Sequence, residues 1–532
     1  MSITILVAGE GALAAFLQET LKECEAWRVR SVPDLKALDK FGAPGVVVLA
    51  GDGKATRRSE AALRRLLRKG GGVVALPPAL EALRGNRGMQ DLLGCPAGSL
   101  AAETEVLLKA QDPGDPIFRG FQDFRLSDRV ALLKGRLKSD LTVHGFFHWD
   151  GRRYPAVFSR PLGKGRICVL ALGGKPGALG NDLLKRVLWR CIAYSGGTYK
   201  TDPIATVVAG GGTLDSEVCQ TVQRVQAAAG FSLRGVVTET AEERLSGLFD
   251  LEEVKCYKSI EKVAADPEVQ LVVLQVPPSK RGPSALRLIK AGKHVVAPQP
   301  LALSLREFDA AIRAARRRNV IFSSLPCGPE AGDFEVIKEA VAQDLLGDVF
   351  HVEAGAGRFE HPDAGWRSDK RLAGSLFDVQ GAELIDWILQ LVQAPVQSVT
   401  AYLQKRVWHD VSIDDWGSLI LKFADGRTAM AEVGTAVGAC RPKWRILGTR
   451  GAVWAEWAME SVTFIYYRNG IASTTRTPVK EKQPDSQFVP VLDAVAAGLP
   501  LQPGSEHARR VVAVLEAARR SAKTGKPVGL AL

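Results

Sequence analysis

The stretch VQLVVLQVPPSKRGPSALRLIKAGKHVVAPQPLALSLREFD, residues 269–309, contains two short apolar runs separated by a helical pattern. The runs, Leu271–Val276 and His294–Ala297, are rich in valine and leucine, which is typical of strands buried on both faces. The segment between them, Ser284–Ala291, has apolar residues at helical spacing. Strands that alternate with helices indicate a parallel sheet with helices on its faces.

The same alternation extends on both sides of this stretch. The predicted elements are, in order, a strand at Ile204–Val208, a helix at Ser216–Ala229, strands at Leu233–Val237 and Leu271–Val276, a helix at Ser284–Ala291, a strand at His294–Ala297, a helix at Leu305–Arg318 and a strand at Val320–Ser323. This rhythm predicts a doubly wound Rossmann domain of the dinucleotide-binding type over residues 203–325.

A glycine-rich turn follows the first predicted strand of this domain, in the sequence VVAGGGTLD of residues 207–215. Gly210 is placed to make a tight turn, and Gly212 and Thr213 to let a pyrophosphate approach the helix N-terminus. Asp215 stands where the third glycine of the fingerprint is expected, which brings a carboxylate close to the phosphates. The turn predicts an NAD or NADP site. The alternative, a turn that binds nothing because the cofactor has been lost, stays open.

A residue that holds the cofactor's ribose is expected about 20 residues further on. The chain reads Thr238-Glu239 directly after the strand Leu233–Val237. Glu239 can accept a hydrogen bond from a ribose hydroxyl, whereas Thr238 can accommodate a 2′-phosphate. The choice between NAD and NADP therefore stays open.

The pattern changes after residue 325. Alternating apolar and polar residues at Gly417–Phe423 and Thr428–Val433, joined by a turn at Asp425-Gly426, indicate antiparallel strands. The last helical pattern, Glu506–Ser521, is amphipathic, and its packing residues are Val511, Val512, Val514, Leu515 and Ala518. Residues 326–532 are therefore predicted to form a second α/β domain.

An N-terminal domain is predicted over residues 1–197. Its apolar runs are Ile3–Ala8, Val46–Leu49, Val73–Leu76 and Ile167–Leu172. They alternate with helical patterns such as Ser59–Lys69, which predicts a parallel sheet covered on both faces. The polar, glycine-containing stretch Ser195–Pro203 is the predicted linker.

The composition of the 532 residues, 46% apolar and 24% charged, is that of a soluble globular protein. The net charge of +12 comes from arginines spread along helices without interleaved aromatic residues, so no nucleic-acid partner is expected. No apolar run approaches the ~20 residues of a membrane helix, and the first residues lack the pattern of a signal peptide. Eight cysteines occur singly, which favours buried, reduced thiols in a cytoplasmic protein and no metal site.

Residues 269–309 closely resemble the Gfo/Idh/MocA family of oxidoreductases, whose members carry a Pro-Pro turn, then Ala-Gly-Lys-His-Val, then Glu-Lys-Pro. Further matching blocks are Leu345–Asp348, Gly365–Arg367, Ala373–Leu389, Asp414–Gly426, Leu447–Gly451 and Ala508–Val528. The resemblance implies a Rossmann domain, a following α/β domain with an open antiparallel sheet, and cofactor contacts at Pro277 and Pro278. It also implies NAD(P)-dependent oxidation or reduction of a sugar or polyol between the two domains.

The residues at the family's two catalytic positions differ in this chain. Where the family has the lysine of Glu-Lys-Pro, the chain has Gln299, which can hydrogen-bond a hydroxyl but does not titrate near neutrality. Counting back from Asp386 places Glu383 at the family's histidine, whereas counting forward from Asp378 leaves one extra residue. Glu383 or Asp378 is the candidate base. The alternative for Glu383 is an ordinary structural carboxylate.

Trp366, Arg367 and Asp386 are retained and are the candidate substrate-binding residues. A tryptophan can stack on a sugar ring, and an arginine can donate hydrogen bonds to its hydroxyls. The alternative is a buried tryptophan beside a surface arginine. Arg281 replaces a histidine that the family often has after the Pro-Pro turn.

Residues 1–197 resemble the trehalose-utilisation (ThuA-like) family, whose sheet is similar to that of glutamine amidotransferases. The resemblance rests on Lys69–Ala75, Asp112–Gly120, Leu126–Arg129, Gly163–Ile167 and Leu172-Gly173. Pro77, Asp115 and Gly174 stand where that family has histidines. The alternative is a module that binds no ligand and serves structure or oligomerisation.

These substitutions favour a non-catalytic or atypical carbohydrate- or nucleotide-binding protein. Its partners would be a sugar ligand, further copies of itself or a catalytic paralogue. The alternative is an active NAD(P)-dependent dehydrogenase or reductase of a sugar or polyol that uses Glu383 or Asp378 as its base.

Overall fold

The computed structural model describes residues 3–24, 26–33, 45–51, 56–210, 216–238, 254–325, 332–362, 365–457, 460–479 and 486–530. The chain divides into two compact units. Unit 1 consists of Met1–Pro203 and Val489–Leu501, and unit 2 consists of Ile204–Phe488 and Gln502–Leu532.

Unit 1 is built on a nine-stranded sheet in the order β2-β1-β3-β4-β11-β10-β9-β6-β7. Its strands are β1 (Ile3–Ala8), β2 (Trp27–Val32), β3 (Val46–Leu49), β4 (Gly72–Ala75), β6 (Thr104–Ala110), β7 (Phe124–Asp128), β9 (Thr142–Trp149), β10 (Arg152–Leu162) and β11 (Gly165–Leu170). A separate pair, β5 (Gly98–Leu100) and β8 (Ala131–Leu133), lies outside it. The helices are α1 (Ala12–Lys22), α2 (Arg57–Arg68), α3 (Pro77–Glu81), α4 (Arg87–Leu93), α5 (Pro176–Leu179), α6 (Asp182–Ser195) and α15 (Val489–Ala497).

The four strands predicted for this unit correspond to β1, β3, β4 and β11, and their parallel pairing is confirmed. The antiparallel continuation of the sheet was not predicted. Strands β2, β1, β3, β4 and β11 are parallel, whereas β11, β10, β9, β6 and β7 pair antiparallel. The antiparallel part of the sheet arises because tight turns between consecutive strands reverse the direction of the chain. Asp150 and Gly151, between β9 and β10, both adopt positive φ (48° and 68°), as a type I′ hairpin turn requires.

A buried ion pair ties the segment Val489–Leu501 into unit 1. Arg190 on α6 donates from Nε to Asp493 Oδ1 on α15 at 2.6 Å, and both side chains are 0% exposed. Arg186 donates to the other oxygen of Asp493 at 3.0 Å. Residues 489–501 were predicted to belong to the C-terminal domain, and this assignment is wrong because their buried partners lie on α6.

A second buried network in unit 1 joins three polar side chains. His144 on β9 lies 2.6 Å from Asp115 Oδ2 through Nδ1 and 2.7 Å from Ser159 Oγ through Nε2. Asp115, which stands where the resemblance expects a histidine, is thus the partner of a different histidine. Because His144 and Ser159 are buried, the network satisfies polar groups inside the sheet.

Helix α6 begins at a side-chain cap, which provides a test of the local structure. Asn181 Oδ1 accepts hydrogen bonds from the backbone N–H groups of Leu183 and Leu184 at 3.0 and 3.1 Å. We expect Asn181→Ala to lower the free energy of unfolding of unit 1 by about 1 kcal/mol, because two helix N–H groups lose their acceptor. Urea unfolding would measure the loss. Asn181→Asp should retain most of the stability, and an equal loss in both variants would contradict the cap.

Unit 2 begins with a six-stranded parallel sheet in the order β14-β13-β12-β15-β16-β17. The strands are β12 (Ile204–Gly210), β13 (Phe231–Val237), β14 (Lys255–Tyr257), β15 (Leu271–Gln275), β16 (His294–Ala297) and β17 (Phe322–Ser324). The helices are α7 (Ser216–Ala227), α9 (Ile260–Ala265), α10 (Pro278–Lys290) and α11 (Leu305–Arg318). In chain order this arrangement is 3-2-1-4-5-6, so the predicted doubly wound Rossmann fold is confirmed.

The second domain of unit 2 has a nine-stranded sheet in the order β25-β24-β23-β22-β18-β21-β20-β19-β26. Its strands are β18 (Val349–Gly357), β19 (Val396–Gln404), β20 (Trp416–Phe423), β21 (Thr428–Gly434), β22 (Trp444–Gly448), β23 (Gly451–Ala455), β24 (Ser461–Arg468), β25 (Ile471–Pro478) and β26 (Val528–Gly529). Its helices are α12 (Gly332–Ala342), α13 (Lys370–Ala373), α14 (Ala382–Leu391) and α16 (Ser505–Thr524). The predicted antiparallel pairing is confirmed except for β18 and β21, which run parallel.

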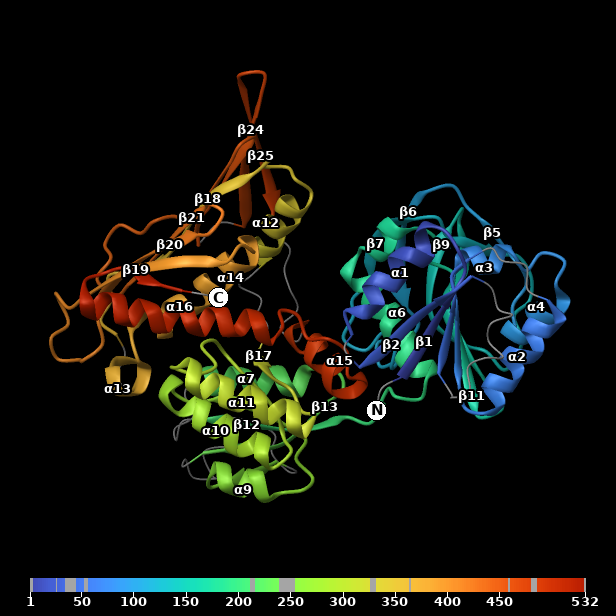
Figure 1. The fold of residues 1–532 in the computed structure, drawn as a ribbon, viewed down its shortest axis with the longest axis horizontal. Coiled ribbons are helices and arrows are strands. Elements are labelled where there is room, and N and C mark those ends of the chain that lie inside the picture. Colours follow the sequence, from blue (N-terminus) through green and yellow to red (C-terminus); the bar gives the residue numbers. More distant parts are fainter. Residues whose placement is uncertain are drawn as a thin grey trace. The chain divides into compact units, whose positions relative to one another are not determined.

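The C-terminal helix α16 joins the cores of both domains of unit 2. Val511, Val514, Leu515 and Ala518 pack in the core of the second domain, where α16 runs along the sheet (Figure 1). Ala508 and Val512 pack in the core of the Rossmann domain. The apolar residues predicted for packing are therefore divided between two cores. None of the helices in the described part of the chain is long and apolar enough to cross a lipid bilayer.

The cysteines match the predicted buried thiols only in part. Seven of them lie in the described residues, and none of the seven forms a disulfide bond. Cys24, Cys95, Cys168 and Cys191 are buried, and burial raises the pKa of the Cys95 thiol to about 12. Cys440, in contrast, is exposed, so the prediction is wrong at that position.

Candidate functional site

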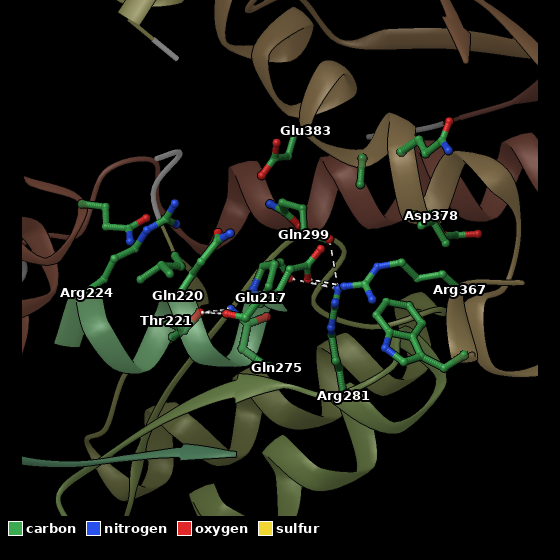
Figure 2. Close-up of a pocket in the computed structure, with 17 residues that line it drawn as sticks. Glu217, Gln220, Thr221, Arg224, Gln275, Arg281, Gln299, Arg367, Asp378 and Glu383 are labelled. Atoms are coloured by element: carbon green, nitrogen blue, oxygen red, sulfur yellow. Dashed lines mark hydrogen bonds and ion pairs between the residues drawn. The ribbon is translucent and has the colours of Figure 1, made fainter. Parts of the chain in front are cut away.

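A pocket of about 290 Å³ lies in unit 2 at the carboxyl ends of strands β12 and β15. Gly210, the last residue of β12, is paired in register with Gln275, which lines the pocket. These two strands flank the point where the strand order reverses, which is where ligands bind in sheets of this kind. The lining residues are Glu217, Gln220, Thr221, Arg224, Gln275, Arg281, Pro298, Gln299, Leu325, Trp366, Arg367, Asp378, Val379, Gln380, Ala382, Glu383 and Gln487 (Figure 2).

Helix α7 supplies one polar wall of the pocket. Glu217, Gln220, Thr221 and Arg224 are three, four and seven residues apart and therefore share one helix face. The valines of the same helix, Val218, Val222 and Val225, are buried instead. Thr221 accepts a hydrogen bond from Gln275 Nε2 at 2.8 Å, which connects the helix to the end of β15. The polar stripe on α7 thus faces the pocket while its apolar face covers the sheet.

A buried arginine holds the turn that follows β16. Arg281 on α10 donates from Nη1 to the carbonyl oxygens of Pro298, Gln299 and Pro300 at 3.0–3.3 Å, and from Nε to Val276 O at 2.9 Å. Burial lowers the pKa of this guanidinium to about 10, while the Glu217 carboxylate opposes the shift. Arg281 therefore fixes the backbone of the turn that presents Gln299 to the pocket.

The Gln299 side chain makes one hydrogen bond to a described residue and leaves its amide oxygen available. Its Nε2 donates to Asp386 Oδ1 at 3.3 Å. Its Oε1 is buried, and no described group donates to it. Because buried carbonyl oxygens normally accept a hydrogen bond, this atom is suited to a hydroxyl or amide of a ligand.

Asp386, predicted to bind substrate, does not line the pocket. Its carboxylate is buried and accepts from Gln299, from Gln390 Nε2 at 2.9 Å and from His507 Nε2 at 2.8 Å. These donors occupy the carboxylate, so the residue positions Gln299. His507 lies on α16, 121 residues away in sequence, and sequence reasoning missed it.

Asp378, predicted as an alternative base, lines the pocket but is buried and held by other groups. Oδ2 accepts from Ser375 N at 2.8 Å and from Ser375 Oγ at 2.6 Å. Oδ1 forms an ion pair with Arg519 of α16, which also donates to Leu303 O. A carboxylate committed to a permanent counter-ion is a weak candidate for proton transfer. The contacts indicate that it anchors the turn before α14.

A π-helical turn, Phe377–Gly381, precedes α14. Such turns accommodate one extra residue inside a helix and are frequent at functional sites. The sequence has one extra residue between Asp378 and Asp386, and the π-helical turn absorbs it. Glu383 is consequently exposed toward the pocket, and Figure 2 shows it pointing into the same region as Gln299. The assignment of Glu383 to the position of the family's histidine stays a prediction.

Trp366 and Arg367, the other predicted substrate residues, both line the pocket. The guanidinium carbon of Arg367 lies 4.2 Å from the centre of the Trp366 ring, within cation–π distance. Arg367 also forms an ion pair with Glu217 of α7. Trp366 Nε1 is buried, and no described group accepts from it.

The predicted cofactor residues lie at several places. A Cβ on Gly210 would meet Val218 Cγ2 at 3.2 Å, so glycine permits the close packing of β12 against α7. Thr238 is buried directly after β13. Pro278 is the first residue of α10 and Pro277 precedes it, and neither lines the pocket. Gly212, Thr213, Asp215 and Glu239 lie outside the described residues. Within the described ranges, no three His, Cys, Asp or Glu side chains gather as metal ligands.

Two family models match this chain, and both matches lie in unit 2. Residues 204–325 match the oxidoreductase family with an NAD-binding Rossmann fold, and residues 334–454 match the GFO/IDH/MocA C-terminal domain. Unit 2 therefore contains the two domains of the Gfo/Idh/MocA oxidoreductases, in the predicted order. The ThuA-like resemblance of residues 1–197 stays a prediction.

Individual proteins agree with the family matches. The chain is 26% identical to the scyllo-inositol 2-dehydrogenase (NADP(+)) IolW of Bacillus subtilis over 226 residues, 41% of this chain and 60% of the relative. It is 26% identical to trans-1,2-dihydrobenzene-1,2-diol dehydrogenase of Xenopus tropicalis over 203 residues, 37% of this chain and 59% of the relative. The chain thus spans about three fifths of the length of these relatives.

Two solved structures each superpose on 62% of the chain. GenD2 from gentamicin A biosynthesis, in complex with NAD, covers 62% of this chain and 97% of its own at 25% identity, with a TM-score of 0.52. An NAD-binding protein from Listeria innocua also covers 62% of this chain and 97% of its own, at 25% identity and with a TM-score of 0.54.

Proposed function

We propose that unit 2 binds NAD or NADP together with a polyhydroxylated ligand in the pocket, and that it is a non-catalytic or atypical relative of the sugar and polyol oxidoreductases. The proposal rests on Gln299. It occupies the place of the catalytic lysine, is held by the turn that Arg281 fixes, and hydrogen-bonds Asp386. An amide can position a hydroxyl but cannot take up its proton near neutral pH.

The residues present fit a dinucleotide at this edge of the sheet. Gly210 ends the first strand at the reversal of strand order, and the buried Gln299 Oε1 lacks a donor among the described residues. Gly210, Gly212 and Thr213 would hold the pyrophosphate, and Thr238 or Glu239 the ribose. When bound, the nicotinamide supplies the capacity to accept or donate a hydride.

An active dehydrogenase is the second candidate, because the π-helical turn directs Glu383 into the pocket beside Gln299. In this case the Glu383 carboxylate would take the proton of the reacting hydroxyl. Gln299 would orient that hydroxyl, and Asp386 would hold the Gln299 amide through its bond to Nε2. General bases typically contribute 10²–10⁴-fold to a rate.

One experiment separates the two candidates. Purified full-length protein is titrated with NAD(H) and NADP(H), and then assayed for cofactor reduction with scyllo-inositol and a panel of sugars. We expect cofactor binding at submillimolar concentration with little turnover. Slow oxidation that disappears in Glu383→Gln, but persists in the exposed control Glu506→Gln, would establish the dehydrogenase instead. Absence of cofactor binding at millimolar concentration would contradict both candidates.

For unit 1 we propose a ThuA-like module with a structural or oligomerising role. The five parallel strands from β2 to β11, covered by helices, support this assignment. The partner would be a further copy of the chain or a catalytic paralogue. Sedimentation of the full-length protein tests self-association, and a monomer at tens of micromolar would leave the paralogue as the proposed partner.

A further inference from the structure

Two buried hydrogen-bond donors in the pocket lining have no acceptor among the described residues. Gln487 is 4% exposed, and its Nε2 has no acceptor among the described residues. Trp366 Nε1 is likewise buried without an acceptor in the described part of the chain. Buried donors are normally paired, so these atoms indicate a ligand that brings acceptor oxygens.

Three arginines and three acidic residues line the pocket, and two of the acidic residues form ion pairs. Of the three acidic lining residues, Glu217 is paired with Arg367 and Asp378 with Arg519. Within the described ranges, no carboxylate lies at ion-pair distance from Arg224 or Arg281. Glu383 is the third acidic residue, and it lies on α14, across the pocket from α7 (Figure 2).

Arg281 is the most constrained of these cations. It is 4% exposed, and its hydrogen bonds to described residues use only Nε and Nη1, all of them to carbonyl oxygens. Nη2 therefore donates to none of the described residues, although Arg281 lines the pocket. Figure 2 shows its guanidinium close to that of Arg367. The Glu217 carboxylate, which pairs with Arg367, also favours the charge on Arg281. A ligand carboxylate beside Nη2 would add to this stabilisation.

We propose that the ligand of this pocket is an acidic sugar, whose carboxylate binds Arg281 while its hydroxyls bind the surrounding amides. This inference rests on the proposed function and narrows its ligand to a chemical class. A planar guanidinium matches a carboxylate in geometry as well as charge. The amides of Gln220, Gln275, Gln299, Gln380 and Gln487 line the same space and can both donate and accept. Trp366 adds an apolar ring face that suits a sugar ring.

A dinucleotide pyrophosphate is the other source of negative charge, so the test separates the two. Full-length protein is titrated calorimetrically with D-glucuronate, D-glucose and ADP-ribose, each alone and in the presence of the others. We expect D-glucuronate to bind at least about 10-fold more tightly than D-glucose, since hydrogen bonds to charged groups are the stronger ones. Its affinity should fall as salt is added, and ADP-ribose should not displace it.

Two variants test whether the carboxylate of the ligand binds Arg281. Arg281→Gln should reduce the preference for D-glucuronate over D-glucose to about twofold or less. Arg287→Gln, on the exposed side of the same helix at 58% side-chain exposure, should leave it unchanged. If Arg281→Gln does not fold, Arg281→Lys keeps the charge but loses the planar fork, and should lower the preference in part.

Three outcomes would overturn the inference. They are equal binding of D-glucose and D-glucuronate, displacement of D-glucuronate by ADP-ribose, and a preference that survives in a folded Arg281→Gln protein. In each of these cases cofactor binding is still measured, so the proposed function stands. Failure of both nucleotides and sugars to bind would overturn the proposed function itself.

Discussion

Asp493→Ala is expected to lower the free energy of unfolding of unit 1 by about 3–5 kcal/mol, because it leaves a buried positive charge without a partner. Arg190 and Asp493 are both 0% exposed, and Arg190 also donates to the carbonyl oxygens of Ile117 and Arg119. The guanidinium therefore cannot turn to solvent without breaking these bonds. Hydrogen exchange of peptides from α6 should accelerate more than 100-fold.

The matched control is an exposed ion pair of the same unit. Arg125 and Glu105 are 68% and 63% exposed, so Glu105→Ala should change the stability by less than about 1 kcal/mol. A fragment of residues 1–203 should show the same fast exchange as Asp493→Ala. Normal protection of α6 in that fragment would show that Val489–Leu501 is not needed to complete unit 1.

Gln299→Lys is expected to raise the rate of cofactor reduction about 100-fold over the natural chain. An ammonium group at this position can donate to the reacting hydroxyl and share its proton, which the amide cannot do. Asp386 Oδ1, now 3.3 Å from Gln299 Nε2, would balance the new charge. The rate is measured as absorbance of NAD(P)H with the sugar or polyol that binds most tightly.

Gln299→Met is the control, since it has similar length but no hydrogen-bonding amide. It should leave the rate at or below that of the natural chain. If the lysine variant is no faster than the methionine variant, Gln299 is not what limits turnover. The double variant Gln299→Lys/Glu383→His then tests whether both family positions must be restored together.

The Rossmann domain could be predicted closely from the sequence because its signals are local. The strand His294–Ala297 and the helix Leu305–Arg318 have their predicted bounds, since the apolar period and the Ser304 cap lie within the segments themselves. Helix α10 starts at Pro278, six residues before the predicted start, because proline is well accommodated in the first turn. Because Pro283 lies inside the same helix, the sequence did not predict the helical turns before Ser284.

The features that escaped prediction depend on partners distant in sequence. The sequence around Asp386 does not indicate that His507 will hydrogen-bond its carboxylate. The sequence around Asp378 likewise does not indicate an ion pair with Arg519. The assignment of Asp493 to unit 1 likewise depends on Arg190, 303 residues earlier. The hairpin at Asp150-Gly151 was predictable in principle, since Asp-Gly is a strong turn signal between strands.

The return of Val489–Leu501 to unit 1 also sets an order of events during synthesis of the chain. Asp493 leaves the ribosome about 290 residues after Pro203. At ~5–20 residues per second, this delay is roughly 15–60 s. During that time the first unit has emerged, but the acceptor for its internal arginine has not been made. During synthesis, unit 1 therefore stays incomplete while the residues of unit 2 are made and begin to fold. In this period chaperones have the most surface to bind.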